Sequence, residues 1–176
     1  MKKHITLPLT AETATQLRAG EAVLISGVIY TARDAAHKRL IALLNNQQPL
    51  PMELQDQVIY FAGPCPAPPG RAIGSAGPTT SGRMDAYSPR LIRECGLRGM
   101  IGKGERNQSV IDAMNECQAV YFAATGGAGA LIAKSIISAE VIAFEDLGPE
   151  AIRKLEVKDF PAIVAIDAHG GNLYRR

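Results

Sequence analysis

The sequence lacks any apolar run long enough to cross a bilayer, for which roughly 18 residues or more are needed. The N-terminal segment Met1–Pro8 has basic residues but no apolar stretch behind them, so we expect no signal peptide. An excess of one charge is also missing, because 19 basic and 17 acidic residues leave a net charge of +2. These absences argue against membrane insertion and against a broad basic surface for nucleic acid, and they predict a cytoplasmic protein.

Cysteine is scarce, with only Cys65, Cys95 and Cys117, and no two of them have C-x-x-C spacing. An odd number without that spacing argues against a disulfide framework in an intracellular chain. Cys95 and Cys117 each end a predicted helix among apolar neighbours, so we interpret both as buried small hydrophobes and not as cluster ligands. Cys65 lies in the proline-rich turn Gly63–Pro66 and is the one cysteine that we expect near a site.

The chain of 176 residues, 47% of them apolar, is long enough for one domain with a substantial core. Strands and helices alternate from residue 58 onward, which favours an α/β fold. The N-terminal part is richer in strands, so we expect a mixed sheet. The expected strands are 5–7, 22–30, 58–62, 99–101, 119–124, 139–144 and 161–167, and the expected helices are 10–17 (closed by Gly20), 35–44, 88–95 (closed by Gly96), one capped by Asn107, and 149–155.

A loop rich in proline and glycine covers residues 63–82 and is too long to be a simple connection, which favours a functional role. It leads into Gly77–Asp85, where Thr79 and Arg83 lie four residues apart. Free backbone N–H groups beside a guanidinium form a natural site for a carboxylate or phosphate. The alternative is a turn whose hydroxyls cap the next helix. The segment is not a P-loop, because it lacks the Gly-Lys-Ser/Thr ending.

A second cation, Lys103, stands between two glycines directly after a predicted strand. Glycines allow a ligand to approach the backbone closely, and an ammonium group there can hold an anion. An exposed lysine on a tight turn explains this segment equally well when it is taken alone.

A polar trio, Arg33, Asp34 and His37, follows the strand that ends at Tyr30. Asp34 is expected to be an ordinary helix cap, and His37 lies one helical turn after Arg33. A structural role is therefore favoured for the trio, while a role in a site stays open. The glycines of Gly127–Gly129 suggest a nucleotide-binding fingerprint only weakly, and a close-packed turn from strand to helix explains them better. His169 is expected to be an exposed turn residue.

Several of these segments, taken together, resemble the β subunit of the iron–sulfur hydro-lyases, class I fumarase and L-tartrate dehydratase. They also resemble the C-terminal domain of single-chain class I fumarases. The likeness covers nearly the whole chain. The segments that carry it are Ala32–His37, Phe61–Pro64, Gly77–Asp85, Gly102–Gly104 and Val157–Ala162.

The resemblance implies a single swivelling β/β/α domain, spanning residues 1–176, that closes over an active site shared with an α subunit. That partner would carry a four-iron, four-sulfur cluster, and this chain would bind no metal. Carried over by motif, Thr79 and Lys103 are expected to be catalytic, with Thr79 as the base. Arg33, Arg83 and Lys103 are expected to bind a small dicarboxylate, supported by Asp34 and His37.

The substrate implied by the resemblance is fumarate, hydrated reversibly to L-malate by a hetero-oligomer. Residues 81–85 and 32–37 look more like the fumarase branch, and the extra hydroxyl of tartrate would need a further polar partner. A tartrate dehydratase β subunit, which would convert tartrate to oxaloacetate, is the main alternative. A non-catalytic module that binds a small anion is the alternative from another functional class.

Overall fold

The computed structural model describes residues 2–64, 67–74, 76–124 and 129–175. Seven strands form one mixed sheet, flanked by helices. The strands are β1 (Lys3–Thr6), β2 (Ala22–Thr31), β3 (Val58–Tyr60), β4 (Gly99–Gly102), β5 (Val120–Ala123), β6 (Ile136–Ala143) and β7 (Ile152–Ile166). The helices are α1 (Ala11–Thr15), α2 (Asp34–Asn45), α3 (Ser88–Cys95), α4 (Gln108–Cys117) and α5 (Gly129–Lys134), with the 3₁₀ segments η1 (Ser81–Met84) and η2 (Glu145–Glu150).

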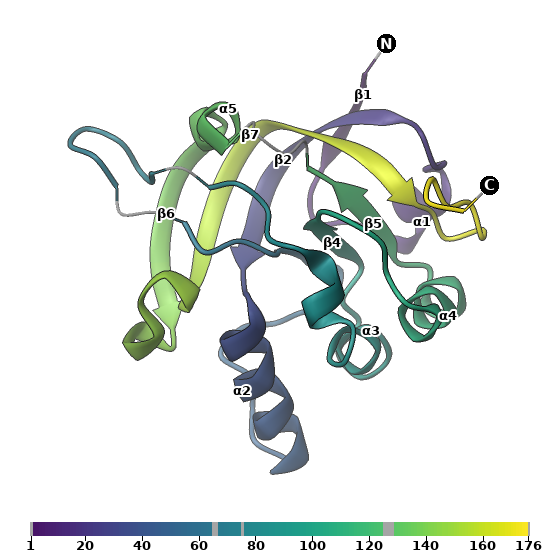
Figure 1. The fold of residues 1–176 in the computed structure, drawn as a ribbon, viewed down its shortest axis with the longest axis horizontal. Helices are drawn as coiled ribbons and strands as arrows, with labels where there is room; N and C mark the ends of the chain where they lie inside the picture. Colours follow the sequence, from purple (N-terminus) through teal and green to yellow (C-terminus); the bar gives the residue numbers. More distant parts are fainter. Residues whose placement is uncertain (1, 65–66, 75, 125–128, 176) are drawn as a thin grey trace.

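The sheet closes on itself through β7, its longest strand. The first five strands run parallel in the order β1-β2-β3-β4-β5. β7 pairs antiparallel with both β2 and β5, which joins the two sides of that parallel array, while β6 adds to β7 as an outer strand. Figure 1 shows β7 curving across the molecule between these neighbours. The result is a barrel-like sheet, and the prediction of an α/β fold with a mixed sheet is confirmed.

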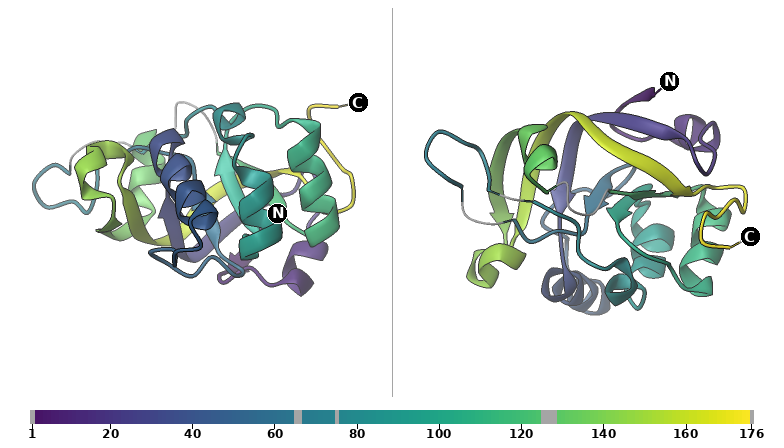
Figure 2. Two further views of the ribbon diagram at one scale, coloured as in Figure 1. Left: turned by 90° about the horizontal axis from the view of Figure 1, so that it is seen from below. Right: turned by 45° about the horizontal axis from the view of Figure 1, so that its top comes forward.

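The two faces of the central strands bury different sets of side chains, because neighbouring residues of a strand point to opposite faces. Val58 and Tyr60 of β3 join one apolar cluster, together with side chains of β1, β2 and β7. Ile59, between them, joins a second cluster with side chains of α2, α3 and α4. Those three helices lie side by side along the sheet (Figure 2). The core therefore consists of a layer within the closed sheet and a layer under the helices.

Most helix ends follow local rules. Thr10 caps α1 and Asn107 caps α4 with side-chain oxygens that accept backbone N–H groups, and Gly96 ends α3 in the left-handed region. Gly20 does not close α1 as expected, because that helix already ends at Gln16, while the Gly20 N–H donates to the Val164 carbonyl 2.8 Å away. No helix in the described parts of the chain is both long and apolar enough to cross a membrane.

The expected helix 149–155 is wrong. Pro149 and Glu150 belong to η2, in which Gly148 takes a non-helical conformation, and residues 152–155 lie in β7. Ile152 and Leu155 have helical spacing, but both are buried in the sheet, where β7 has hydrogen-bonding neighbours on both sides. Tertiary pairing thus overrides a local helical preference.

Candidate active site

The site residues predicted from the sequence lie where three neighbouring parallel strands end. Arg33 follows β2, the loop containing Thr79 and Arg83 follows β3, and Lys103 directly follows β4. Carboxyl ends of adjacent parallel strands share one edge of a sheet, and this edge is where ligands commonly bind in α/β folds. The topology therefore brings together residues that are 70 positions apart in sequence, from Arg33 to Lys103.

The Thr79 loop is fastened to the segments beside it by its backbone. The N–H of Thr79 donates to the Phe61 carbonyl at 2.7 Å. Thr80 forms a parallel bridge with Lys103, and the N–H of Ser81 donates to the Lys103 carbonyl at 2.9 Å. Thr79 and Lys103 thus lie on adjacent extended segments, the first half-buried and the second exposed.

The two arginines approach the site from α2 and η1. Arg83 Nη1 lies 3.8 Å from Asp34 Oδ2, which links η1 to the first turn of α2. Arg33 passes close to Gly63, where a Cβ atom would lie 3.0 Å from its Cδ and 3.2 Å from its Nη1. A side chain at position 63 would crowd the guanidinium, so this glycine leaves room for Arg33 beside the long loop.

The start of α2 differs from the expected cap. Arg33, not Asp34, occupies the N-cap position and makes no capping hydrogen bond through its side chain, while Asp34 is the first helical residue. The N–H of Ala35 donates instead to Glu150 Oε1 at 3.3 Å. Because the cap comes from η2, both Arg33 and Asp34 keep their side chains available for other contacts.

His37 is fully buried beneath these charges. Its Nδ1 lies 2.9 Å from the Arg33 carbonyl, and its ring packs against Phe61 and Tyr87 at centroid distances of 5.5 and 6.0 Å. Since a carbonyl can only accept, Nδ1 carries the proton and Nε2 is an acceptor when the ring is neutral. Burial lowers the pKa of His37 to about 4, with a smaller effect in the same direction from Arg106. The ring is therefore uncharged at neutral pH.

Three buried polar atoms in this short segment have no hydrogen-bond partner among the described residues: Arg33 Nε, Asp34 Oδ1 and His37 Nε2. Buried polar groups are nearly always paired in folded proteins. Their concentration within one helical turn indicates a place where a polar ligand or a group from another chain completes the hydrogen bonding.

Sequence reasoning missed the most buried charge near the site. The Arg106 side chain is fully buried, and its Nε donates to Asp85 Oδ1 at 2.6 Å. Tyr121 was predicted only as part of a strand, yet its hydroxyl lies 2.7 Å from Ser81 Oγ. The sequence did contain one signal, the closeness of these residues to predicted site residues. Arg106 follows Lys103 by three residues, and Asp85 follows Arg83 by two.

The cysteines give no sign of a metal centre in the described residues. Cys95 and Cys117 pack against the cluster under the helices, as small hydrophobes would, but they are half-buried and not buried as expected. No group of three His, Cys, Asp or Glu side chains gathers there as metal ligands would. Cys65 and residues 125–128, which include most of the Gly127–Gly129 segment, lie outside the described residues. That this chain binds no metal stays a prediction.

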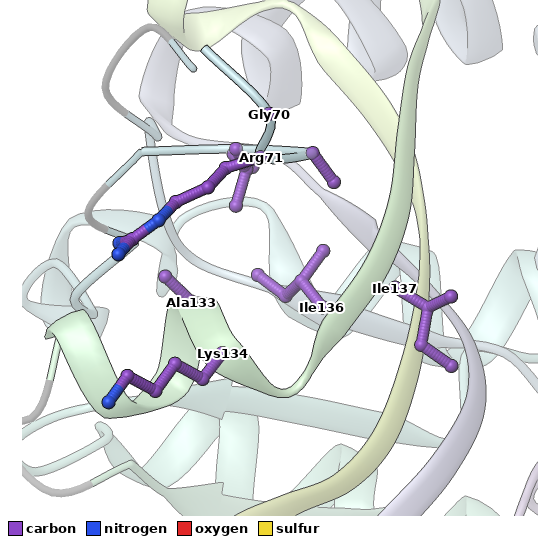
Figure 3. A pocket seen from close by; sticks show the side chains of 8 residues that line it. Gly70, Arg71, Ala133, Lys134, Ile136 and Ile137 are labelled. Atoms are coloured by element: carbon purple, nitrogen blue, oxygen red, sulfur yellow. The ribbon is translucent and has the colours of Figure 1, made fainter. Parts of the chain in front are cut away.

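A separate pocket of about 320 Å³ lies between the tip of the long loop and α5. Figure 3 shows Arg71 and Lys134 at its rim, with Ile136 and Ile137 beside it. None of the site residues predicted from the sequence lines it, as far as the chain is described. The pocket is thus distinct from the strand ends that carry Arg33, Thr79 and Lys103.

Comparison with known proteins gives a consistent set of relatives. A family model described as the fumarase C-terminus matches residues 1–176. Fumarate hydratase 2 of Leishmania major is 39% identical over 163 residues, covering 92% of this chain and 29% of that protein. The aerobic class I fumarate hydratase of Escherichia coli K12 is 41% identical over 153 residues, covering 86% of this chain and 28% of that protein. A putative L(+)-tartrate dehydratase subunit beta from Methanocaldococcus jannaschii is 37% identical over 171 residues, covering 94% and 88%.

Proposed function

Because the chain belongs to the fumarase C-terminus family, we propose that it is the substrate-binding half of a hydro-lyase that hydrates fumarate reversibly to L-malate. The chain spans less than a third of the fumarate hydratases described above but most of the tartrate dehydratase subunit. The similarity to a protein described as a subunit supports an enzyme in which a second subunit supplies the rest of the active site. We expect that hetero-oligomer to work in the cytoplasm.

One observation carries the proposal: Arg33 and Lys103 follow β2 and β4 at the same edge of the sheet, and the Thr80–Lys103 bridge and the Asp34 contact hold Arg83 beside them. Fumarate and malate are dianions, and three cations can hold two carboxylates. The planar guanidinium groups suit bidentate binding of a carboxylate, whereas the ammonium of Lys103 acts as a point charge. Asp34 and His37 would support this set from below, Asp34 through Arg83 and His37 through the Arg33 carbonyl.

The proton transfer next to a carboxylate requires a base, for which we propose Thr79. A threonine hydroxyl ionises near neutral pH only where cations lower its pKa strongly. In this proposal Lys103, on the adjacent segment, and Arg83, four residues after Thr79, would supply that field. Lys103 would thus serve both binding and catalysis.

A four-iron, four-sulfur cluster held by the partner subunit completes the proposal. When bound, it would supply a Lewis acid for the substrate hydroxyl. The described residues of this chain offer no set of three ligands for it, so this chain is expected to bind and orient the dicarboxylate and to move the proton.

Replacing Thr79 by valine tests the assignment of the base. In the enzyme reconstituted anaerobically with its partner, iron and sulfide, we expect Thr79→Val to lower kcat for malate dehydration by about 100-fold or more, with a smaller change in KM. Thr80→Val is the matched control, because its described link to Lys103 is a backbone pairing. Normal kcat in Thr79→Val would remove Thr79 as the base. No turnover of either malate or tartrate by the wild-type enzyme would contradict the hydro-lyase itself.

The same assay separates the main alternative. The relative that matches in length is described as a tartrate dehydratase subunit, which favours tartrate as the second candidate substrate. Measuring kcat/KM for L-malate and L(+)-tartrate side by side decides between them. Tight dicarboxylate binding without turnover, in the presence of an active partner, would instead support a non-catalytic anion-binding module.

A further inference from the structure

Arg106 is a buried cation that none of the proposed substrate contacts uses. Its side chain is fully buried, and that of its partner Asp85 is 12% exposed. Burying a guanidinium is costly unless its donors are paired, and a buried ion pair is weak evidence for stability alone. The contacts of Arg106 therefore need an explanation in terms of what they hold in place.

The guanidinium joins the segment that follows Arg83 to the segment that follows Lys103. Arg106 Nε donates to Asp85 Oδ1 at 2.6 Å, and Nη2 donates to Ser88 Oγ at 2.8 Å. The second oxygen of Asp85 accepts the N–H of Asn107 at 2.8 Å, at the N-cap of α4. One carboxylate thus binds both a side chain and a backbone group of the Lys103 segment, which fixes the orientation of η1 as well as its distance.

Two aromatic rings enclose the same guanidinium. Its central carbon lies 5.1 Å from the ring centroid of Phe61 and 5.0 Å from that of Tyr121. Phe61 also provides the carbonyl that accepts the Thr79 N–H. The Tyr121 hydroxyl donates to the Gly104 carbonyl at 2.8 Å, so at 2.7 Å it accepts from Ser81 Oγ. Each ring that stacks on Arg106 is therefore bonded to a segment of the site.

We infer that Arg106 is a positioning residue that sets the distance and orientation of Arg83 and Thr79 relative to Lys103. The expected effect on turnover rests on the proposed function. The positioning of the Arg83 and Lys103 segments does not. Misplacing a bound group by about 1 Å can cost roughly 100-fold in rate. A rigid link between the two halves of the cation set is thus what binding a dicarboxylate at two ends requires.

The test replaces Arg106 by lysine. Lysine keeps the positive charge, but its ammonium group lacks the planar fork with which a guanidinium donates hydrogen bonds in fixed directions. In the reconstituted enzyme we expect Arg106→Lys to lower kcat/KM by about 10- to 100-fold, with a rise in KM as well as a fall in kcat. Arg98→Lys is the matched control: Arg98 Nη2 lies 2.7 Å from Asp56, and its Nη1 donates to the Cys117 carbonyl. We expect its kcat/KM to stay within about twofold of the wild type, since Arg98 precedes β4 and lies at the opposite end of that strand.

Hydrogen exchange in the same preparations provides a readout that does not depend on catalysis. The Ser81 N–H donates to the Lys103 carbonyl, whereas the Leu7 N–H donates to the Ser26 carbonyl beside the edge strand β1. In Arg106→Lys we expect the Ser81 amide to exchange about tenfold faster with little change at Leu7. If both amides accelerate equally, or if neither does, Arg106 is merely structural and the inference fails.

The two proposals fail in distinguishable ways. A wild-type enzyme without hydro-lyase activity would end the proposed function but leave the exchange comparison valid. Unchanged kcat/KM in Arg106→Lys, beside an active wild type, would end the inference alone. If Arg106→Lys does not fold, the double variant Arg106→Met with Asp85→Asn removes both charges from the pair. Wild-type kinetics and wild-type Ser81 exchange in that variant would likewise overturn the positioning role.

Discussion

His37 makes the stability of this protein depend on pH. Its pKa is lowered from 6.5 to about 4 by burial, so between these values the unfolded chain binds a proton that the folded chain excludes. Unfolding free energy therefore rises with pH across this window: the contribution is complete above about 6.5 and is lost as the pH falls toward 4. The charged residues around the ring are Arg33, Asp34 and Arg106.

Urea denaturation at pH 7 and pH 4.5 measures this effect. We expect the wild type to lose on the order of 3 kcal/mol over the full window from His37, and His37→Gln to lose correspondingly less. His4→Gln is the control, because that side chain is exposed. Carboxylates with lowered pKa values, such as Asp56 and Asp167, contribute mainly at still lower pH. An identical pH dependence in wild type and His37→Gln would contradict the assignment.

The sequence predicted where the charged site residues stand but not how they are held. The predicted site residues follow glycine-bounded turns or strand ends, and such positions can be recognised without a structure. They are Arg33, Thr79, Arg83 and Lys103. Their roles in catalysis stay predictions. The position of Arg106 near Lys103 was visible in the sequence, but its burial was not. An arginine before a helix cap is exposed in most proteins, and packing between Phe61 and Tyr121 buries this one.

At the scale of elements, the end of β4 is pressed against η1. A Cβ atom on Gly102 would lie only 1.9 Å from Ser81 Oγ and 2.8 Å from Phe61 Cδ2. Gly102→Ala must therefore push η1 away from the Lys103 segment. We expect a loss of about 1–3 kcal/mol in unfolding free energy, measured by urea denaturation. Gly82→Ala in η1 is the control, since its Cβ would meet nothing within 4 Å. Equal unfolding free energies of the two variants would show that η1 moves aside without loss of stability.

Elements with local signals were predictable, whereas β7 was not. The cap of Asn107, the Pro89 start of α3 and the Gly96 end all act within a few residues, and each appears where the sequence indicates. β7 has 15 residues and pairs with β2 and β5, which are distant in sequence, as well as with the preceding strand β6. A local pattern contains no record of those partners, so a helix at 149–155 was the wrong conclusion.

At the scale of the molecule, the resemblance found from five short segments is confirmed by a family match over the full chain. The sequence did not predict that β7 closes the sheet. The position of the candidate site depends instead on the parallel order of β2, β3 and β4, which makes their carboxyl ends neighbours. The Arg83 side chain is 59% exposed and Lys103 is also exposed. If these cations bind the substrate as proposed, a second surface is needed to exclude solvent from it.

This geometry predicts that the isolated chain folds but does not turn over dicarboxylates. Calorimetric titration of the chain with L-malate should show weak binding, because exposed charges are screened by salt. Addition of the proposed cluster-bearing subunit under anaerobic conditions should produce fumarate from malate, which a spectrophotometric assay follows directly. The partner alone, and the partner with Arg83→Ala or Lys103→Met, serve as controls and should be inactive or weakened by about 100-fold or more. Turnover by the isolated chain would contradict the division of the active site between two subunits, and full activity of the partner alone would show that the cations of this chain serve another purpose.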